Sequence, residues 1–177
     1  DKMSDIMRVM ENEQLENLYY GKRVSDESSF DLYHEEGMRS QMSICVPEPG
    51  LLSMHYTRQE YPSYGTGDYR SPAMTILQEN GSRVTEFRYQ GYRILEGKPS
   101  LLPLPAVYTE SNEEAQTLEI TLRDSIMDTD LILSYTIFRD YAVLARNARF
   151  EHHGSAPIVL ERAMSMSIVE PTRHIRV

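Results

Sequence analysis

One segment of the 177-residue chain gathers side chains that suit sugar recognition. Residues 58–72 read RQEYPSYGTGDYRSP and place Tyr61, Tyr64 and Tyr69 around two glycines. A phenol ring offers a flat apolar face with a polar tip, the kind of group that stacks on a sugar ring. If the backbone is extended there, Asp68 and Arg70 fall on one side of it, where a carboxylate and a guanidinium could bind hydroxyl groups.

The same residues, called the tyrosine–glycine segment below, also fit a purely structural interpretation. Glycine lets a backbone turn tightly, and an Asp68–Arg70 ion pair could hold a surface loop in shape without touching a ligand. The residue types leave both interpretations open and favour the structural one. Tyr61, Tyr64, Asp68 and Arg70 are the candidate sugar-contacting residues of the chain.

Acidic residues could in principle perform glycoside hydrolysis, which needs two carboxyl groups at a fixed separation. Asp124, Asp128 and Asp130 cluster at a predicted turn between two strands. Asp is common in turns because it hydrogen-bonds nearby backbone groups, and the Asp-x-Asp-x-Asp-Gly pattern of a calcium loop is missing. We therefore interpret these three as solvated turn residues and predict no catalytic residue in the chain.

The sequence also lacks the patterns of metal, nucleophilic and cofactor sites. His152 and His153 are adjacent, so on a strand they point to opposite faces, a poor arrangement for two ligands of one metal. No Gly-x-Ser-x-Gly or cysteine-centred motif is present, and Gly65-Thr-Gly67 lacks the third glycine of a dinucleotide fingerprint. Cys45 lies in an apolar run and is expected to be a small buried hydrophobe. We predict neither a metal nor a cofactor.

Composition and charge exclude two classes of partner. Asp and Glu number 27 against 18 Lys and Arg, a formal net charge of −9, and an acidic surface without a basic run repels nucleic acid. No stretch approaches the roughly 20 apolar residues of a membrane-spanning helix, so no membrane partner is expected.

Leu, Ile, Val and Phe make up about 23% of the residues, little above the lower limit of about 20% for a buried core. A globular fold with a small hydrophobic core is therefore expected.

Strand patterns dominate the chain and position these candidates. Strands are expected over residues 5–11, 15–21, 51–59, 73–79, 84–95, 117–123, 130–138, 142–151 and 158–169. Residues 130–138 are apolar on both faces, as is typical of a central strand. Asn12-Glu13 and Asn80-Gly81 indicate hairpin turns, the second of type I′. Helical periodicity is poor except over residues 29–37. Hairpins without crossover helices indicate an all-β fold, an antiparallel β-sandwich.

Several motifs together resemble one known family. In chain order they are residues 18–22, 59–72, 78–82, 87–89, 101–106, 117–122 and 133–138, and the run Tyr-Pro-Ser-Tyr-Gly-Thr-Gly-Asp at 61–68 is the most specific. Over roughly residues 5–170 the chain resembles the amino-terminal domain of bacterial α-galactosidases of glycoside hydrolase family 36. The resemblance implies that it is the first part of a β-supersandwich of the galactose-mutarotase-like kind.

In that family a (β/α)8 barrel follows the sandwich and carries the two aspartates that act as nucleophile and as acid/base. Neither can be placed here, so the resemblance implies that residues 1–177 are a non-catalytic domain, truncated at both ends and without its barrel. The implied parent enzyme removes terminal α-linked galactose from sugars such as melibiose and raffinose. The domain would serve assembly and shape the sugar site, with its own barrel and neighbouring subunits of a homo-oligomer as partners. The tyrosine–glycine segment would lie near the sugar-binding mouth.

The alternative is a free-standing carbohydrate-binding or structural β-sandwich. Zero Trp argues mildly against a free-standing sugar-binding module, whereas twelve Tyr keep it open. A single cysteine fits a reducing compartment, and a bacterial cytoplasmic location is expected.

Overall fold

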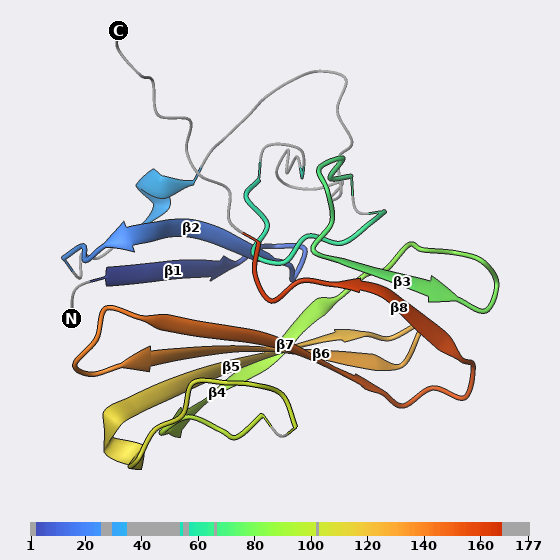
Figure 1. Ribbon diagram of the computed structural model, residues 1–177. Helices are drawn as coiled ribbons and strands as arrows, with labels where there is room; N and C mark the ends of the chain where they lie inside the picture. Colours follow the sequence, from blue (N-terminus) through green and yellow to red (C-terminus); the bar gives the residue numbers. More distant parts are fainter. Residues whose placement is uncertain are drawn as a thin grey trace, which may run out of the picture.

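The computed structural model describes residues 3–25, 30–34, 54, 57–65, 67–101 and 103–167, and these ranges are built from strands (Figure 1). The strands are β1 (Met3–Val9), β2 (Leu15–Lys22), β3 (Met74–Gln78), β4 (Arg88–Glu96), β5 (Ala115–Asp124), β6 (Thr129–Phe138), β7 (Leu144–His152) and β8 (Ile158–Ala163). Two 3₁₀ turns, η1 (Asp31–Tyr33) and η2 (Asn112–Glu114), complete the described elements. Every strand pair is antiparallel, which confirms the predicted fold class.

The largest sheet has the strand order β4–β5–β6–β7, so neighbours in the sheet are neighbours in sequence. β5 and β6 pair without a register shift over their whole length. Residues on both faces of β6 are buried, for example Leu131 at 0% and Ile132 at 5% exposure. The apolar pattern of residues 130–138 thus predicted a central strand correctly.

β1 and β2 form a hairpin around the predicted turn at Asn12-Glu13. Glu13 adopts a positive φ of 64°, and Asn12 Oδ1 accepts the N–H of Gln14 at 3.1 Å, as in the turns that Asn favours. In Figure 1 this hairpin lies over the four-stranded sheet. Leu15, the first residue of β2, belongs to the core that joins the two layers.

The pairing of β3 differs from the prediction. β3 pairs with β8 and not with the strand that follows the Asn80-Gly81 turn. In that turn only Gly81 has a positive φ, of 82°, whereas a type I′ turn requires it at both central residues. The N–H of Gly81 donates to the carbonyl of Gln78 at 2.9 Å, an ordinary four-residue turn.

The chain leaves the edge of β3 after this turn because Phe87, the first aromatic residue after it, is buried in the core. Phe87 is only 4% exposed, and the N–H of Glu86 donates to the Asp124 carboxylate at 2.7 Å. These contacts carry the chain to the large sheet, where β4 begins at Arg88.

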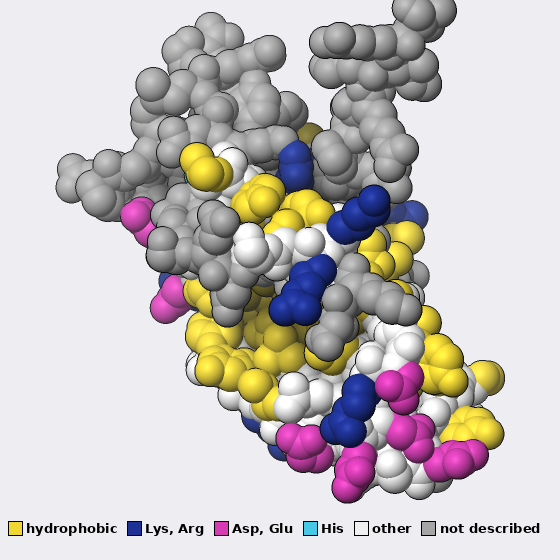
Figure 2. Space-filling view, turned by 90° about the vertical axis from the view of Figure 1, so that its left-hand side faces the viewer, with side chains coloured by type: hydrophobic (Ala, Val, Ile, Leu, Met, Phe, Trp, Pro, Cys, Tyr) yellow, Lys and Arg dark blue, Asp and Glu magenta, His cyan; other side chains and the backbone are white. Residues whose placement is uncertain are grey.

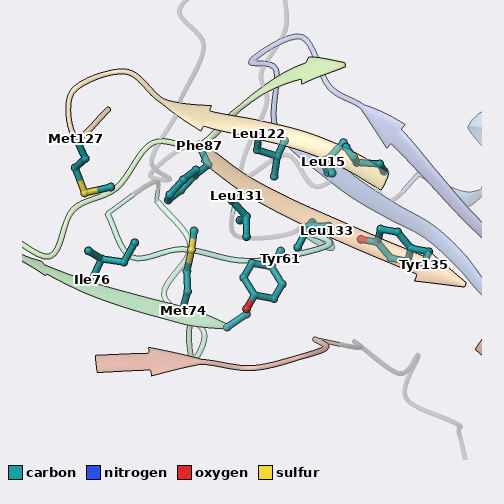
Figure 3. Packing of buried hydrophobic residues seen from close by; sticks show 12 residues of the cluster. Leu15, Tyr61, Met74, Ile76, Phe87, Leu122, Met127, Leu131, Leu133 and Tyr135 are labelled. Atoms are coloured by element: carbon teal, nitrogen blue, oxygen red, sulfur yellow. The ribbon is translucent and has the colours of Figure 1, made fainter. Parts of the chain in front are cut away.

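One hydrophobic cluster fills the space between the layers (Figure 3). It consists of Leu15, Tyr61, Ala73, Met74, Ile76, Phe87, Ile120, Leu122, Met127, Leu131, Leu133 and Tyr135. Met74 and Ile76 of β3 lie across from Leu131 of β6, and each of the three is at most 1% exposed. Full burial of such a side chain stabilises a fold by roughly 1.5–3 kcal/mol. The two small sheets and the large sheet therefore share one core, as a β-sandwich requires.

Some predicted elements are shorter in the structure than expected, and others fall outside the described residues. The strand predicted for 158–169 ends at Ala163. Most of 51–59 lies outside the described residues, although Gln59 forms an isolated bridge with Glu16. The described part of 29–37 contains only η1, and Cys45 is not among the described residues. In the ranges given above, no helix has the length and apolar character needed to cross a membrane.

Candidate functional site

Backbone hydrogen bonds hold both ends of the tyrosine–glycine segment against the sandwich. The N–H of Glu60 donates to the carbonyl of Leu15 in β2 at 3.0 Å, and the N–H of Ala73 donates to the carbonyl of Pro62 at 2.8 Å. The first bond ties the start of the segment to the β1–β2 hairpin. The second brings the chain back on itself before β3 begins.

Asp68 and Arg70 meet, as predicted, and they brace the segment from inside. Asp68 is only 6% exposed. Arg70 Nε and Nη2 donate to Asp68 Oδ1 and Oδ2 at 2.8 and 2.7 Å, and Gln59 Nε2 donates to Oδ2 at 2.8 Å. Arg70 Nη2 also donates to the carbonyl of Thr57. Two-pronged pairs of this kind are strong and geometrically specific, so these contacts hold the segment in one shape.

The three tyrosines of the segment lie in different surroundings. Tyr61 is 7% exposed, packs in the core (Figure 3) and donates its hydroxyl to the carbonyl of Met164. Burial raises the pKa of this phenol to about 12. Tyr64 and Tyr69 are 56% and 77% exposed. Within the segment, the rings exposed to solvent are therefore those of Tyr64 and Tyr69, whereas Tyr61 anchors the segment to the sandwich.

The position of Tyr64 depends on the glycine that follows it. Gly65 has a φ of +99°, and a Cβ atom there would lie 2.6 Å from Cγ1 of Val84. Only glycine fits such a close approach at such a φ. The N–H of Thr85 donates to the carbonyl of Tyr64 at 3.2 Å, so the tip of the segment rests on the residues that lead into β4.

A buried ion network that no local sequence pattern predicts lies at the base of the segment. Glu60 is 0% exposed. Its Oε1 accepts the hydroxyl of Tyr135 at 2.9 Å and the guanidinium of Arg146, and its Oε2 accepts the amide of Asn17 at 2.7 Å. The guanidinium carbon of Arg146 lies 4.7 Å from the centre of the Tyr135 ring. The network joins β2, β6 and β7 to the segment.

Asp5 of β1 adds a second carboxylate to this network. The Asn17 amide donates to Asp5 Oδ1 at 3.0 Å, while the buried Oδ2 has no hydrogen-bond partner among the described residues. Burial raises the pKa of Asp5 against the opposing effects of the Arg146 charge and the Asn17 hydrogen bond. Burial also lowers the pKa of Arg146. Burial therefore disfavours the charged form of Asp5 more than Arg146 and Asn17 favour it.

The acidic cluster at residues 124–130 has structural roles. The expectation of a solvated turn is wrong for Asp124, which is 2% exposed. Its carboxylate accepts the backbone N–H groups of Glu86, Ile126 and Met127. Asp128 and Asp130 both pair with Arg123. Each of these carboxylates is thus held by a partner, which is the chemistry of a shaped turn and not of a hydrolytic pair.

Comparisons with known proteins agree on one family. The model of the glycosyl hydrolase family 36 N-terminal domain matches residues 13–176. Alpha-galactosidase AgaA of Geobacillus stearothermophilus is 39% identical over 171 residues, which are 97% of this chain and 23% of that protein. Alpha-galactosidase 1 of Pediococcus pentosaceus is 34% identical over 94% of this chain and 23% of its own length. The chain spans about a quarter of the length of these relatives.

Solved structures give the same result. The α-galactosidase from Lactobacillus brevis matches with a TM-score of 0.88 and 33% identity, over 94% of this chain and 22% of that one. A variant of AgaA in complex with raffinose matches with a TM-score of 0.87 and 39% identity, over 93% of this chain and 23% of the other. The resemblance predicted from the motifs is confirmed. The chain belongs to the family of glycosyl hydrolase family 36 N-terminal domains.

Proposed function

We propose that this chain is the non-catalytic N-terminal domain of an α-galactosidase that hydrolyses terminal α-galactosides of the melibiose and raffinose type. The observation that carries the proposal is the 39% identity with AgaA over 97% of this chain, which is only 23% of AgaA. Structures of AgaA variants with raffinose and with stachyose support the substrate class. The catalytic barrel of the parent lies in the remainder of such a protein.

The described carboxylates support a non-catalytic role. A retaining glycosidase needs two carboxyl groups about 5–5.5 Å apart, on either side of the bond that it cleaves. The buried carboxylates of the described residues already bind a cation or several N–H groups; they are Glu16, Glu60, Asp68, Glu119 and Asp124. Side chains committed in this way stabilise the sandwich, and hydrolysis falls to residues of the parent outside this chain.

In the assembled enzyme the tyrosine–glycine segment lies near the sugar-binding mouth, either of the same subunit or of a neighbour. Tyr61, Tyr64, Asp68 and Arg70 are the residues proposed to lie near this mouth. The exposure of these four side chains supports two different roles, contact with the sugar and support of the contacting residues. Tyr64 is 56% exposed and the Arg70 side chain 34%, so these two meet the sugar, while the buried Tyr61 and Asp68 hold them in place.

The domain also serves assembly, with the catalytic barrel and neighbouring subunits of a homo-oligomer as partners. Open strand edges support this, because β3 and β8 form a sheet of only two strands among the described residues, and open edges tend to be paired or covered. Figure 2 shows hydrophobic side chains exposed at several places on the face turned toward the viewer. With a net charge of −9, nucleic acid is not among the partners. A bacterial cytoplasmic location completes the proposal.

The DNA downstream of the codon for Val177 tests the proposal. An open reading frame that continues into a (β/α)8 barrel with paired aspartates is the expected result. A stop codon at that point would favour the alternative, a free-standing sandwich.

One surface pocket supports the alternative function, a free-standing carbohydrate-binding module. It has a volume of about 250 Å³ and is lined by, among others, Tyr141, Glu96, Glu113 and Arg139. An exposed phenol beside charged groups suits a sugar ring with its hydroxyls. Titration of the chain with melibiose distinguishes the two functions. Saturable binding that Tyr141→Ala abolishes would favour a carbohydrate-binding module, and no binding by the folded chain would favour the proposal above.

A further inference from the structure

We propose that Asp130, Glu151 and His153 form a binding site for a divalent transition-metal ion, with Zn²⁺ as its representative. Each residue offers one ligand atom, and the three atoms lie within 4.8 Å of one another. The site lies where β6 begins and β7 ends. In Figure 1 the turns between β5 and β6 and between β7 and β8 are both at the right-hand end of the four-stranded sheet.

The strand register brings these side chains together. Asp130 of β6 lies directly opposite Glu151 of β7, and two carboxylates in that position repel each other unless positive charge lies beside them. His153 follows Glu151 by two residues, so its side chain lies on the same face. The N–H of His153 donates to the carbonyl of Asp128 at 2.8 Å, which fixes its backbone beside the start of β6.

The spacing of two ligand atoms matches a chelate. His153 Nε2 lies 3.1 Å from Asp130 Oδ2. Ligand atoms about 2.0–2.2 Å from a zinc ion, at angles of roughly 90–110°, are about 2.8–3.6 Å apart. The third ligand comes from Glu151, whose side chain is 40% exposed. A shift of its carboxylate by roughly 1 Å is enough to bring it to the same separation.

Two arginines hold the carboxylates without using both oxygens of either. Arg123 Nη1 donates to Asp130 Oδ1 at 2.7 Å, and Arg149 pairs with Glu151 Oε1. Asp130 Oδ2 and Glu151 Oε2 are then the ligand atoms, and each carboxylate is oriented by a hydrogen-bond donor, as metal-binding carboxylates commonly are. The arginine charges and the exposed position predict weaker binding than at a closed four-ligand zinc site.

The ligand set selects the class of ion. One imidazole with two carboxylates suits Zn²⁺, Co²⁺, Ni²⁺ or Mn²⁺ better than Ca²⁺ or Mg²⁺, which prefer oxygen ligands alone. Three protein ligands leave a fourth position for water. Bound there, the ion joins the start of β6 to the end of β7 and neutralises the facing carboxylates.

His152 and His153 point to different faces, as their adjacency in sequence predicts, and this makes His152 a matched control. Its Nδ1 lies 2.8 Å from Thr129 Oγ1, and its Nε2 lies 2.9 Å from the carbonyl of Ala156. Both ring nitrogens of His152 thus have hydrogen-bond partners on the face of β7 opposite the proposed site. The carboxylate beside His153 in the proposed site belongs to Asp130 of the neighbouring strand β6. Adjacency in sequence does not reveal this contact.

The test is a titration of the untagged 177-residue chain with ZnCl₂ by calorimetry, and with CoCl₂ by visible absorption, at about pH 7.5, where an ordinary imidazole is neutral. We expect one equivalent of Zn²⁺ to bind and to raise the melting temperature. His153→Gln and Asp130→Asn should each weaken binding about tenfold or more, because each removes a ligand. His152→Gln should bind Zn²⁺ as the wild type does.

Circular dichroism establishes that each variant is folded before it is titrated. Two results would overturn the proposal. One is no binding of either ion by the wild type up to about 1 mM, a very weak affinity for a site. The other is undiminished binding by folded His153→Gln. In either case the His153–Asp130 contact is a hydrogen bond and nothing more.

Discussion

Replacing Arg146 by methionine is expected to destabilise the fold strongly. The change removes the charge and keeps an unbranched side chain that can still pack over the Tyr135 ring. Glu60, at 0% exposure, is left with the Tyr135 hydroxyl and the Asn17 amide as donors but without a counter-charge. A buried carboxylate in that state has lost its hydration without compensation.

The expected magnitude follows from this burial. Removing one partner of a buried ion pair costs about 3–5 kcal/mol, because the remaining charge stays uncompensated. In a domain of this size each kcal/mol lowers the melting temperature by roughly 2–4 °C. The melting temperature of Arg146→Met should therefore fall by roughly 6–20 °C. Adding Glu60→Gln to the same chain should recover part of the loss, since no orphaned charge remains.

Thermal unfolding of the 177-residue chain, followed by circular dichroism at neutral pH, measures the effect. Arg83→Met is the matched control, because the Arg83–Glu161 pair has side-chain exposures of 46% and 33%. Exposed pairs of this kind contribute little to stability. If Arg146→Met melted within about 2 °C of that control, a range equivalent to less than 1 kcal/mol, the network would not hold the sheets and the segment together.

Two further predictions concern Asp5 and the tyrosine–glycine segment. Because burial raises the pKa of Asp5, its contribution to stability is complete below the ordinary value of 3.8 and is lost as the pH rises through the folded-state pKa. The melting temperature of Asp5→Asn should therefore increase relative to the wild type between about pH 4 and pH 7. In the parent enzyme, Tyr64→Ala and Asp68→Ala should raise KM with kcat little changed in steady-state kinetics, since Tyr64 contacts the bound sugar, Asp68 positions Arg70 beside it, and neither acts on the reacting bond.

Each of these predictions has an outcome that contradicts it. A melting-temperature difference between Asp5→Asn and the wild type that stays constant with pH would mean that burial does not disfavour the charged form of Asp5. For the segment, lost thermal stability with unchanged KM in both variants would mean that it only braces the domain. Tyr64→Ala is the cleaner probe of sugar contact, because Asp68 also holds Arg70 and Gln59.

The period-two pattern predicted where most strands lie, but it predicted their pairing only where the partners are neighbours in sequence. Residues 117–123, 130–138 and 142–151 correspond closely to β5, β6 and β7, because hairpin pairing needs only local information. The partner of β3 could not be predicted in this way. Asn80-Gly81 marks a turn, but the burial of Phe87 decides which sheet the chain joins afterwards. The true partner, β8, begins only at Ile158.

The candidate site was predictable only where its interacting residues are close in sequence. A spacing of two residues suggested that Asp68 and Arg70 would meet, and they do. The three tyrosines are alike in sequence, and only three-dimensional packing separates the buried Tyr61 from the others. Glu60 and Arg146 are 86 residues apart, so no local spacing could pair them.

Whether the chain is a non-catalytic domain of an α-galactosidase is tested most directly by one assay. Release of nitrophenol from a nitrophenyl α-galactoside is measured side by side for the 177-residue chain and for the parent protein. We expect release by the parent and none by the chain above the level of a boiled sample, because hydrolysis needs two positioned carboxyl groups, and the buried carboxylates of the described residues already bind cations or N–H groups. Release by the chain alone, or a folded parent without activity on α-galactosides, would contradict the proposed function.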